Sequence, residues 1–190
     1  MPSEFLGFMS SGVSQAEVVI EEHQDQVTRL ARLYALHAPR AGRLAYLLTG
    51  DPELAQDLAQ EAFVRLMGRL SAIRDDAVVA AYLRRSIVNL VRKHWRKLGY
   101  ERRYLRGGLE GAGPAPELAP ELDRRDELWR ALDTLPYQQR AAIVLRFYED
   151  LSERDTARVL GCALGTVKSS VSRGLQRMRE EMVDDAGLRD

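Results

Sequence analysis

Basic and amide side chains recur at helical spacing along one face of the segment 77–97. They are Arg84, Arg85, Asn89, Arg92, Lys93 and Arg96. Arginine and lysine neutralise phosphates, and asparagine can form two hydrogen bonds with the edge of an adenine. The alternative is an ordinary solvated helix face. Asn89 favours the nucleic-acid interpretation, because asparagine is a mediocre helix former and gains nothing from solvent at that place.

Two aromatic residues add flat surfaces to the same segment. Trp95 and Tyr82 are placed where an unstacked base could lie against a ring. The alternative is that both rings belong to the protein core. We interpret Tyr82 as a core residue, whereas Trp95 fits either role.

A second cluster with nucleic-acid character lies within 151–179. Ser152 is expected to cap a short helix that ends at Leu160, and Gly161 permits a tight turn. A second helix is expected to begin near 164–166 and to carry a polar and basic outer face, formed by Lys168, Ser169, Ser172, Arg173 and Gln176. This arrangement predicts a helix-turn-helix, the alternative being a plain helical hairpin.

Little else in the sequence offers chemistry. The three histidines are scattered and no nucleophile motif is present, so no assembled enzyme site and no cofactor are expected. Cys162 is the only cysteine, which excludes an internal disulfide framework and a cysteine-based zinc site and favours the cytoplasm. No apolar run approaches the ~18 residues of a membrane span, and the N-terminus lacks the basic region of a signal peptide.

The elements that position the first cluster are all predicted to be helices. Apolar residues in 26–37 follow helical spacing, and Pro39 is expected to interrupt this helix and to open a second one. Gly50 suits the position after a helix end. Asp51 and Pro52 then fit the cap and first residue of an amphipathic helix over 52–70. The core side of the helix 77–97 is predicted to hold Val79, Leu83, Ile87, Leu90 and Val91.

Two further helices are predicted ahead of the helix-turn-helix. The first carries Leu128, Leu132 and Leu135 and is stopped by Pro136. The second spans about 137–148, and its predicted core residues are Ile143, Val144 and Phe147. No alternating apolar pattern of strand length is present, so the fold class is all-α.

The charge distribution divides the chain into two domains. The 28 basic and 28 acidic side chains give a formal net charge of zero. Nine basic residues and one acidic residue nevertheless lie in 81–106, and six basic residues and one acidic residue lie in 154–179. The segment 107–120 between them holds four glycines and three prolines and reads as a flexible linker. The predicted boundaries are an extension at 1–25, a domain at 26–100, a linker at 101–121, a domain at 122–183 and a tail at 184–190.

Taken together, these motifs resemble the extracytoplasmic-function sigma factors, most of all the SigE-like actinobacterial subgroup. Region 2 of that family resembles 46-YLLTGDPELAQDLAQEAFVRL-66 and 81-AYLRRSIVNLVRKHWRK-97. Region 4 resembles 134-TLPYQQRAAIVLRFYEDLSERDTARVLG-161 and 165-GTVKSSVSRGLQRM-178. The resemblance covers most of 26–180 and implies two small helical domains, a region 2 bundle and a region 4 domain with its helix-turn-helix.

The resemblance also implies partners and roles. The partners are core RNA polymerase, promoter DNA and, commonly in this family, an anti-sigma factor; no membrane insertion is implied. The polymerase would dock on Asp57, Gln60 and Glu61. The −10 element would be read and melted by Arg84, Arg85, Asn89, Arg92, Lys93, Trp95 and Arg96. The −35 element would be contacted by Arg140, Lys168, Ser169, Ser172 and Arg173, with Arg140 and Arg146 as phosphate or structural contacts.

The sequence departs from the family pattern at two places in region 4. Ser170 stands where the family usually has arginine, which predicts a lost contact. Thr156 replaces a family isoleucine, which predicts looser packing of the first helix. The alternative function is a stand-alone helix-turn-helix regulator that binds DNA without the polymerase.

Overall fold

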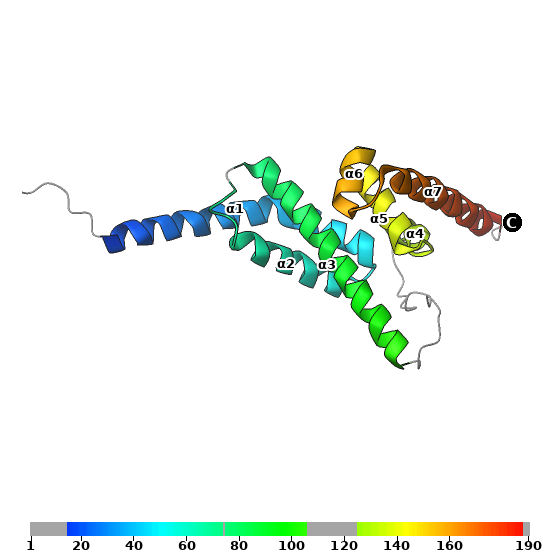
Figure 1. Cartoon of the computed structure of the whole chain (residues 1–190), viewed down its shortest axis with the longest axis horizontal. Coiled ribbons are helices and arrows are strands. Elements are labelled where there is room, and N and C mark those ends of the chain that lie inside the picture. The colour runs from blue at the N-terminus through cyan, green and yellow to red at the C-terminus, as the bar shows by residue number, and fades with distance from the viewer. Residues whose placement is uncertain (1–14, 74, 106–124, 188–190) are drawn as a thin grey trace, which may run out of the picture.

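Helices make up all the regular structure that this computed structural model describes, which covers residues 15–73, 75–105 and 125–187. The N-terminal unit consists of α1 (Gln15–Thr49), α2 (Pro52–Met67) and α3 (Asp76–Leu105). The C-terminal unit consists of α4 (Arg125–Asp133), α5 (Tyr137–Ile143), the π-helical turn η1 (Val144–Tyr148), α6 (Glu153–Leu160) and α7 (Leu164–Gly187). The all-α prediction is confirmed, and Figure 1 shows the two units side by side. Most of the predicted linker lies outside the described residues.

The first helix is longer than predicted. α1 runs without a break from Gln15 to Thr49 and contains Pro39, so the predicted interruption at this proline is wrong. Proline lacks the N–H that would bond to the carbonyl of Ala35. Both residues are exposed, and water can therefore solvate that carbonyl.

The turn from α1 to α2 follows the sequence signals. Gly50 has a φ of 77° and donates its N–H to the carbonyl of Tyr46 at 2.7 Å. The Asp51 carboxylate then accepts from the backbone N–H groups of Glu53 and Leu54, and Pro52 is the first residue of α2. These contacts confirm the predicted C-terminal glycine and N-cap.

The N-terminal unit closes around apolar faces of its three helices. The predicted core side of α3 is confirmed, since Val79, Leu83, Ile87, Leu90 and Val91 are all buried. α2 ends at Met67 rather than at 70, and Leu70 is buried in the turns that follow it. α3 continues to Leu105, into the predicted linker, and its last turns project beyond the bundle (Figure 1).

In the C-terminal unit, the π-helical turn η1 changes which side chains of residues 144–148 face the core. Ile143 and Val144 are buried as predicted, but Phe147 is 60% exposed, so its assignment to the core is wrong. The N–H of Glu149 bonds to the carbonyl of Val144 five residues earlier, at 3.1 Å. The wider turn departs from the 3.6-residue period on which the prediction rested.

The helix-turn-helix has the predicted caps. The Ser152 hydroxyl accepts from the N–H of Asp155 at 3.0 Å, and α6 ends at Leu160. Gly161 has a φ of 64°, the left-handed conformation that the turn requires. α7 begins at Leu164, and the side chain of Val167 in its first turn is fully buried.

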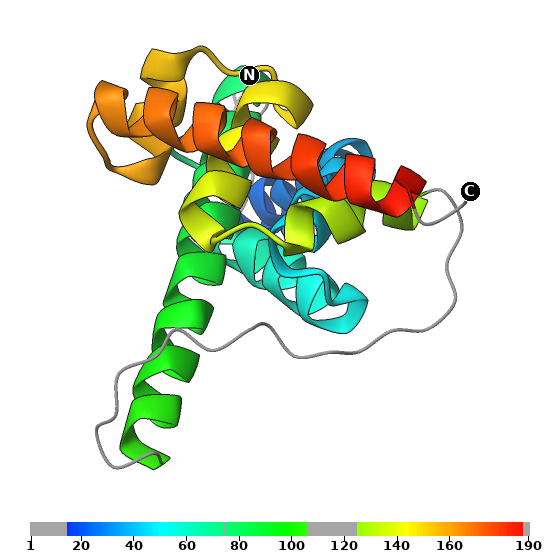
Figure 2. The same ribbon diagram turned by 90° about the vertical axis from the view of Figure 1, so that its right-hand side faces the viewer.

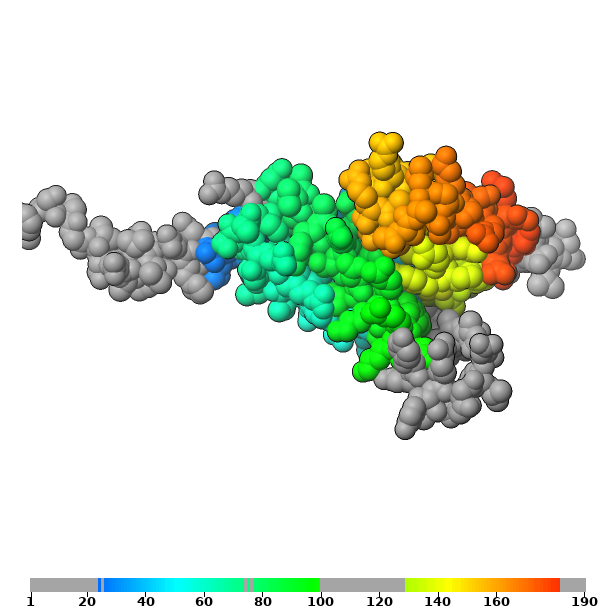
Figure 3. All heavy atoms as spheres, viewed as in Figure 1, coloured from blue at the N-terminus to red at the C-terminus, as the bar shows by residue number. Residues whose placement is uncertain are grey.

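The two units share one hydrophobic core. Their buried side chains form a single contiguous cluster, in which Leu48 and Val88 of the N-terminal unit join Leu132 and Leu145 of the C-terminal unit. Figure 2 shows the C-terminal unit lying against α1 and α3, and the space-filling view in Figure 3 shows the two in direct contact. None of the described helices is long and apolar enough to cross a membrane.

Candidate nucleic-acid interface

The basic stripe predicted on α3 divides into an open part and a covered part. Arg85, Lys93 and Arg96 are exposed. Arg84 and Asn89 are partly buried. Trp95 is also partly buried and packs against the hydrophobic core, and its indole N–H is buried with no hydrogen-bond partner among the described residues. Arg92 is exposed as well, although it is hydrogen-bonded, so four cations of the stripe are exposed on the described part of α3.

Arg84 is covered because it forms an ion pair with the C-terminal unit. Its Nε donates to Oε2 of Glu149 at 2.6 Å, and Nε of Arg40 donates to Oε1 of the same carboxylate at 3.0 Å. The Glu149 side chain is 3% exposed and the Arg84 side chain 17%. A carboxylate buried to this extent depends on its partners, because an unpaired buried charge costs about 3–5 kcal/mol. Glu149 thus ties α1 and α3 to the C-terminal unit.

Arg92 links the same two units. Its Nη1 donates to the carbonyl of Leu160 at 3.2 Å, and its Nη2 donates to Oδ1 of Asn89 at 2.8 Å. Leu160 is the last residue of α6, where the helix dipole favours a cation. Arg92 and Asn89 therefore face the C-terminal unit in this structure.

Arg140 was placed in the −35 set as a phosphate or structural contact. It is only 5% exposed, which favours the structural role. Its guanidinium donates to the carbonyls of Leu132, Asp133 and Leu135, to the Asp133 carboxylate, and across the domain boundary to the carbonyl of Leu48 at 3.4 Å. Burial lowers the pKa of this guanidinium, and the Asp133 carboxylate opposes that shift. Arg140 therefore joins α5 to α1 through the carbonyl of Leu48.

Arg146 is likewise occupied inside the C-terminal unit. Its Nη1 donates to the carbonyl of Leu151. The prediction left this residue between a phosphate contact and a structural contact. The hydrogen bond favours the structural role.

The outer face of α7 is open. Lys168, Ser172 and Arg173 are exposed, and Ser169 is partly exposed. Arg173 is held along the helix, with Nε donating to the Ser169 carbonyl at 3.1 Å and Nη2 donating to the Ser169 hydroxyl at 3.2 Å. Lys168 lies 3.7 Å from a carboxylate oxygen of Glu153. These four residues form one polar face with two cations.

Two departures from the family pattern lie on the inner side of the same domain. Ser170 is only 3% exposed, so this position faces the core and not a DNA backbone. The expected loss of a contact or phosphate clamp at this position stays a prediction. Thr156 is fully buried, and its hydroxyl has no hydrogen-bond partner among the described residues. A buried unpaired hydroxyl destabilises a fold by about 1–3 kcal/mol, and the expected looser packing of the first helix stays a prediction.

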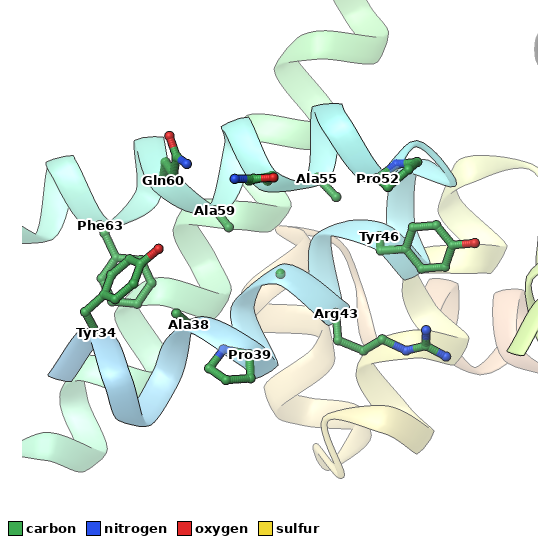
Figure 4. A pocket seen from close by; sticks show the side chains of 12 residues that line it. Tyr34, Ala38, Pro39, Arg43, Tyr46, Pro52, Ala55, Ala59, Gln60 and Phe63 are labelled. Atoms are coloured by element: carbon green, nitrogen blue, oxygen red, sulfur yellow. The ribbon is translucent and has the colours of Figure 1, made fainter. Parts of the chain in front are cut away.

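The three residues predicted to dock the polymerase lie on the exposed side of α2. Asp57, Gln60 and Glu61 are all exposed, and Glu61 pairs with Arg65 at 2.6 Å. Gln60 also lies at a groove of about 390 Å³ between α1 and α2. Figure 4 shows the groove framed by Tyr34 and Phe63 at one end and Tyr46 and Arg43 at the other. An acidic helix beside an aromatic groove forms a surface distinct from both basic faces.

The aromatic contacts that join the two units were not predicted from the sequence. Trp129 packs against Tyr46 with ring centroids 5.7 Å apart, and the Arg140 guanidinium lies 4.7 Å from the centroid of the Trp129 ring. The hydroxyl of Tyr137 donates to the carbonyl of Val88 at 3.2 Å. Burial raises the pKa of Tyr137 to about 12. The local signal for this contact is the presence of two large aromatic residues, Trp129 and Tyr137, in the short helices α4 and α5.

Comparison with family models matches both units. The model for Sigma-70 region 2 matches residues 19–100. The model for Sigma-70 region 4 matches residues 125–178. Together they contain both basic faces and the acidic helix.

Curated relatives and solved structures agree with these matches. The RNA polymerase sigma-E factor of Streptomyces coelicolor is 38% identical over 74% of this chain and 78% of its own length. The ECF RNA polymerase sigma factor SigM of Mycobacterium tuberculosis is 33% identical over 77% of this chain and 74% of its own length. A co-crystal structure of the sigma factor RpoE with the anti-sigma factor NepR from Bartonella quintana has a TM-score of 0.62 and 29% identity, covering 79% of this chain and 94% of that chain.

Proposed function

The chain belongs to the extracytoplasmic-function sigma factors of the sigma-70 family, and from that premise we propose how its residues divide the work of promoter recognition. Such a factor binds core RNA polymerase, recognises the −35 and −10 elements of a promoter and helps to melt the DNA. It is a DNA-binding regulator, and we propose that it has no catalytic activity of its own. The stand-alone regulator is not favoured, because both sigma regions are present in order. The proposed compartment is the cytoplasm, where its polymerase and promoter are found.

The observation that carries the proposal is the presence of two separate basic faces on two helical units. On α7, the open face formed by Lys168, Ser169, Ser172 and Arg173 is proposed to enter the major groove at the −35 element. Serine and arginine can read base edges there, while lysine neutralises phosphate. Arg140 is left out of this set because it is buried.

On α3, the stripe is proposed to bind the −10 element. Arg85, Lys93 and Arg96 are exposed and would neutralise phosphates. Asn89 and Trp95 are proposed to meet a base that leaves the stack, since an amide and an aromatic ring suit an unstacked base. Arg84 and Arg92 complete the stripe once they are free of the C-terminal unit.

The acidic helix α2 is proposed to dock on the polymerase. Asp57, Gln60 and Glu61 are exposed and lie on a different helix from both basic faces. An anti-sigma factor is proposed as a further partner, because the solved structure of a similar sigma factor contains one.

Run-off transcription tests the proposed function. Core polymerase is mixed with genomic fragments, with and without the protein, and the 5′ ends of the transcripts are sequenced. We expect discrete start sites that require the protein and share two upstream sequences. An absence of such starts, with tight DNA binding by the protein alone, would instead establish the stand-alone regulator.

A further inference from the structure

Arg29 on α1 is hydrogen-bonded to the connection between α2 and α3. We propose that it is a positioning residue for −10 recognition: its guanidinium fixes the turns at residues 68–73, and through them the start of α3 and the basic stripe that this helix carries. The inference rests on the proposed assignment of α3 to the −10 element. It adds a residue outside both proposed DNA faces that acts on DNA through the backbone of other residues.

The Arg29 guanidinium holds two carbonyl groups at once. Its Nη1 donates to the carbonyl of Leu70 at 3.0 Å, and its Nη2 donates to the carbonyl of Ile73 at 2.5 Å. Figure 1 shows the connection between α2 and α3 passing beside α1, where these bonds form. A guanidinium is planar and presents its donors in a fixed fork, whereas lysine offers a point charge on a flexible stem. The contact therefore uses the property that distinguishes arginine from lysine.

The two bonds fix the place of the turns, which their own backbone bonds do not. Within the turns, the N–H of Ala72 bonds to the carbonyl of Arg69 at 3.0 Å, and the N–H of Ile73 bonds to the carbonyl of Leu70 at 3.3 Å. Such bonds set the local shape of a turn without attaching it to another helix. Leu70 is 4% exposed and gives one point of attachment to the core. The bond from Arg29 to Ile73 gives a second point, so the turns cannot pivot about Leu70.

The turns lead directly into α3. This helix begins at Asp76, three residues after Ile73. The carboxylate of Asp75 accepts from the N–H of Ala77 at 2.9 Å and caps the first turn. Arg29 therefore holds the chain immediately before the capped end of α3, and the direction in which the helix leaves the turns depends on this contact.

A further hydrogen bond joins the end of α2 to the start of the stripe. The hydroxyl of Tyr82 donates to the carbonyl of Arg65, in the last turn of α2, at 3.2 Å. Tyr82 lies two residues before Arg84 and three before the exposed Arg85. The turns and the first members of the stripe are thus tied to the same end of α2. Binding side chains must be held within about 0.5 Å of their working geometry, so a shift of this end weakens DNA binding although no DNA contact is removed.

The geometry separates Arg29 from the residues proposed to bind phosphate. It is half-buried, and both of its terminal nitrogens donate to backbone carbonyls. The proposed −10 cations lie on α3, whereas Arg29 lies on α1. A loss of −10 affinity on changing Arg29 is therefore expected to come from lost geometry rather than from lost charge. The variant Arg29→Lys separates these two causes, because it keeps the charge and loses the fork.

Preformed holoenzyme tests the proposal with two DNA probes whose sequences come from run-off transcription. One probe is a fluorescent fork-junction DNA with the −10 element, and the other is a fluorescent duplex with the −35 element alone. Arg29→Gln is expected to bind the fork junction about tenfold more weakly than wild type, the size of effect expected from losing a hydrogen bond to a charged group. It is expected to bind the −35 duplex as wild type does. Arg29→Lys is expected to remain at least about threefold weaker than wild type on the fork junction.

Arg130→Gln is the matched control. It makes the same chemical change at an exposed arginine on α4, outside both proposed DNA faces. It is expected to bind both probes as wild type does. Because the holoenzyme is formed before the probes are added, a difference in polymerase affinity does not enter the comparison.

Hydrogen exchange on the free protein measures the hold on the turns without DNA. The N–H groups of Ala72 and Ile73 are expected to exchange faster in Arg29→Gln than in wild type, because the turns open more often. They are expected to exchange at the wild-type rate in Arg130→Gln. If Arg29→Gln folds poorly, Arg29→Lys replaces it in both measurements.

Several outcomes would overturn the positioning role. Wild-type affinity of Arg29→Gln for the fork junction would remove the residue from −10 recognition. Equal losses on both probes would indicate a general loss of folded protein, and wild-type affinity in Arg29→Lys would assign the effect to charge. An absence of protein-dependent transcripts would instead overturn the proposed function, and the exchange of the two N–H groups would then still show whether Arg29 holds the turns.

Discussion

The indole of Trp129 occupies the space beside Gly50 that any larger residue would need. A Cβ built on Gly50 would lie 1.7 Å from Cζ2 of Trp129. The glycine is also required by its φ of 77°, which closes the turn between α1 and α2. Gly50 therefore has two roles: it ends α1, and it leaves room for the Trp129 side chain of the C-terminal unit.

Gly50→Ala is expected to destabilise the protein and to expose Trp129. The left-handed backbone costs about 1–2 kcal/mol for alanine, and the collision with the indole adds to this. Chemical denaturation measures the loss, and the emission of Trp129 in a Trp95→Phe background reports its exposure. Gly42→Ala is the control, because a Cβ there meets nothing within 4 Å. It is expected to stabilise the helix by about 0.5–1 kcal/mol.

Thr156→Val is expected to stabilise the protein by about 1 kcal/mol. The change keeps the shape of a fully buried side chain and removes a hydroxyl that has no hydrogen-bond partner among the described residues. Thermal unfolding checks this. Ser152→Ala, which removes the N-cap of the same helix, is expected to cost about 1 kcal/mol. A lower melting temperature for Thr156→Val would show that the hydroxyl has a partner.

Arg173→Ala is expected to weaken recognition of the −35 element by about 1–3 kcal/mol if the guanidinium contacts a base. The measurement compares holoenzyme binding to promoters with and without substitutions in that element. Arg177→Ala, one turn further along α7, is the control, because its Nη1 is directed at the carbonyl of Thr134. Unchanged promoter discrimination in Arg173→Ala would remove this residue from the interface.

The double variant Asp57→Lys and Glu61→Lys is expected to bind core polymerase at least tenfold more weakly, about 1.4 kcal/mol or more, because it reverses two charges on the proposed docking face. Its helix content should match that of wild type, since both residues are exposed. Pull-down with core polymerase measures the affinity. Glu181→Lys on α7 is exposed and is expected to leave the affinity unchanged.

Stability is expected to fall between pH 10 and pH 12 because of Tyr137. Burial raises its pKa to about 12 from the ordinary value of 10.0, so the phenol stays protonated longer in the folded protein. Its contribution is fully present below pH 10, where both states are protonated, and is lost as the pH rises toward 12. The loss amounts to about 2–3 kcal/mol at most. Denaturation at each pH checks this, and Tyr137→Phe is expected to remove this part of the pH dependence.

Local signals predicted the local structure well. Gly50, Asp51 and Pro52 marked one helix boundary, and Ser152 and Gly161 marked both ends of another, because each cap bonds within a few residues of itself. The buried face of α3 followed directly from its apolar spacing. The outer face of α7 is exposed where the polar spacing placed it.

The contacts between the units could not be predicted in the same way. Glu149 lies 65 residues from Arg84, and Arg140 lies 92 residues from Leu48, so no sequence window contains both partners. From sequence alone, an arginine that donates to distant backbone carbonyls cannot be distinguished from an arginine that contacts DNA. The π-helical turn at 144–148 also has no local signature, and it moved Phe147 to the surface.

The side chains that join the two units have a chemical character of their own. Beyond the shared aliphatic cluster, the contacts are made by Trp129, Tyr137, Tyr46 and the arginines, each of which combines an apolar body with a polar end. Such groups tolerate water as well as burial. Separating the units would therefore expose the aliphatic side chains of the shared cluster, whereas the rings and guanidinium groups around it would gain water with little penalty.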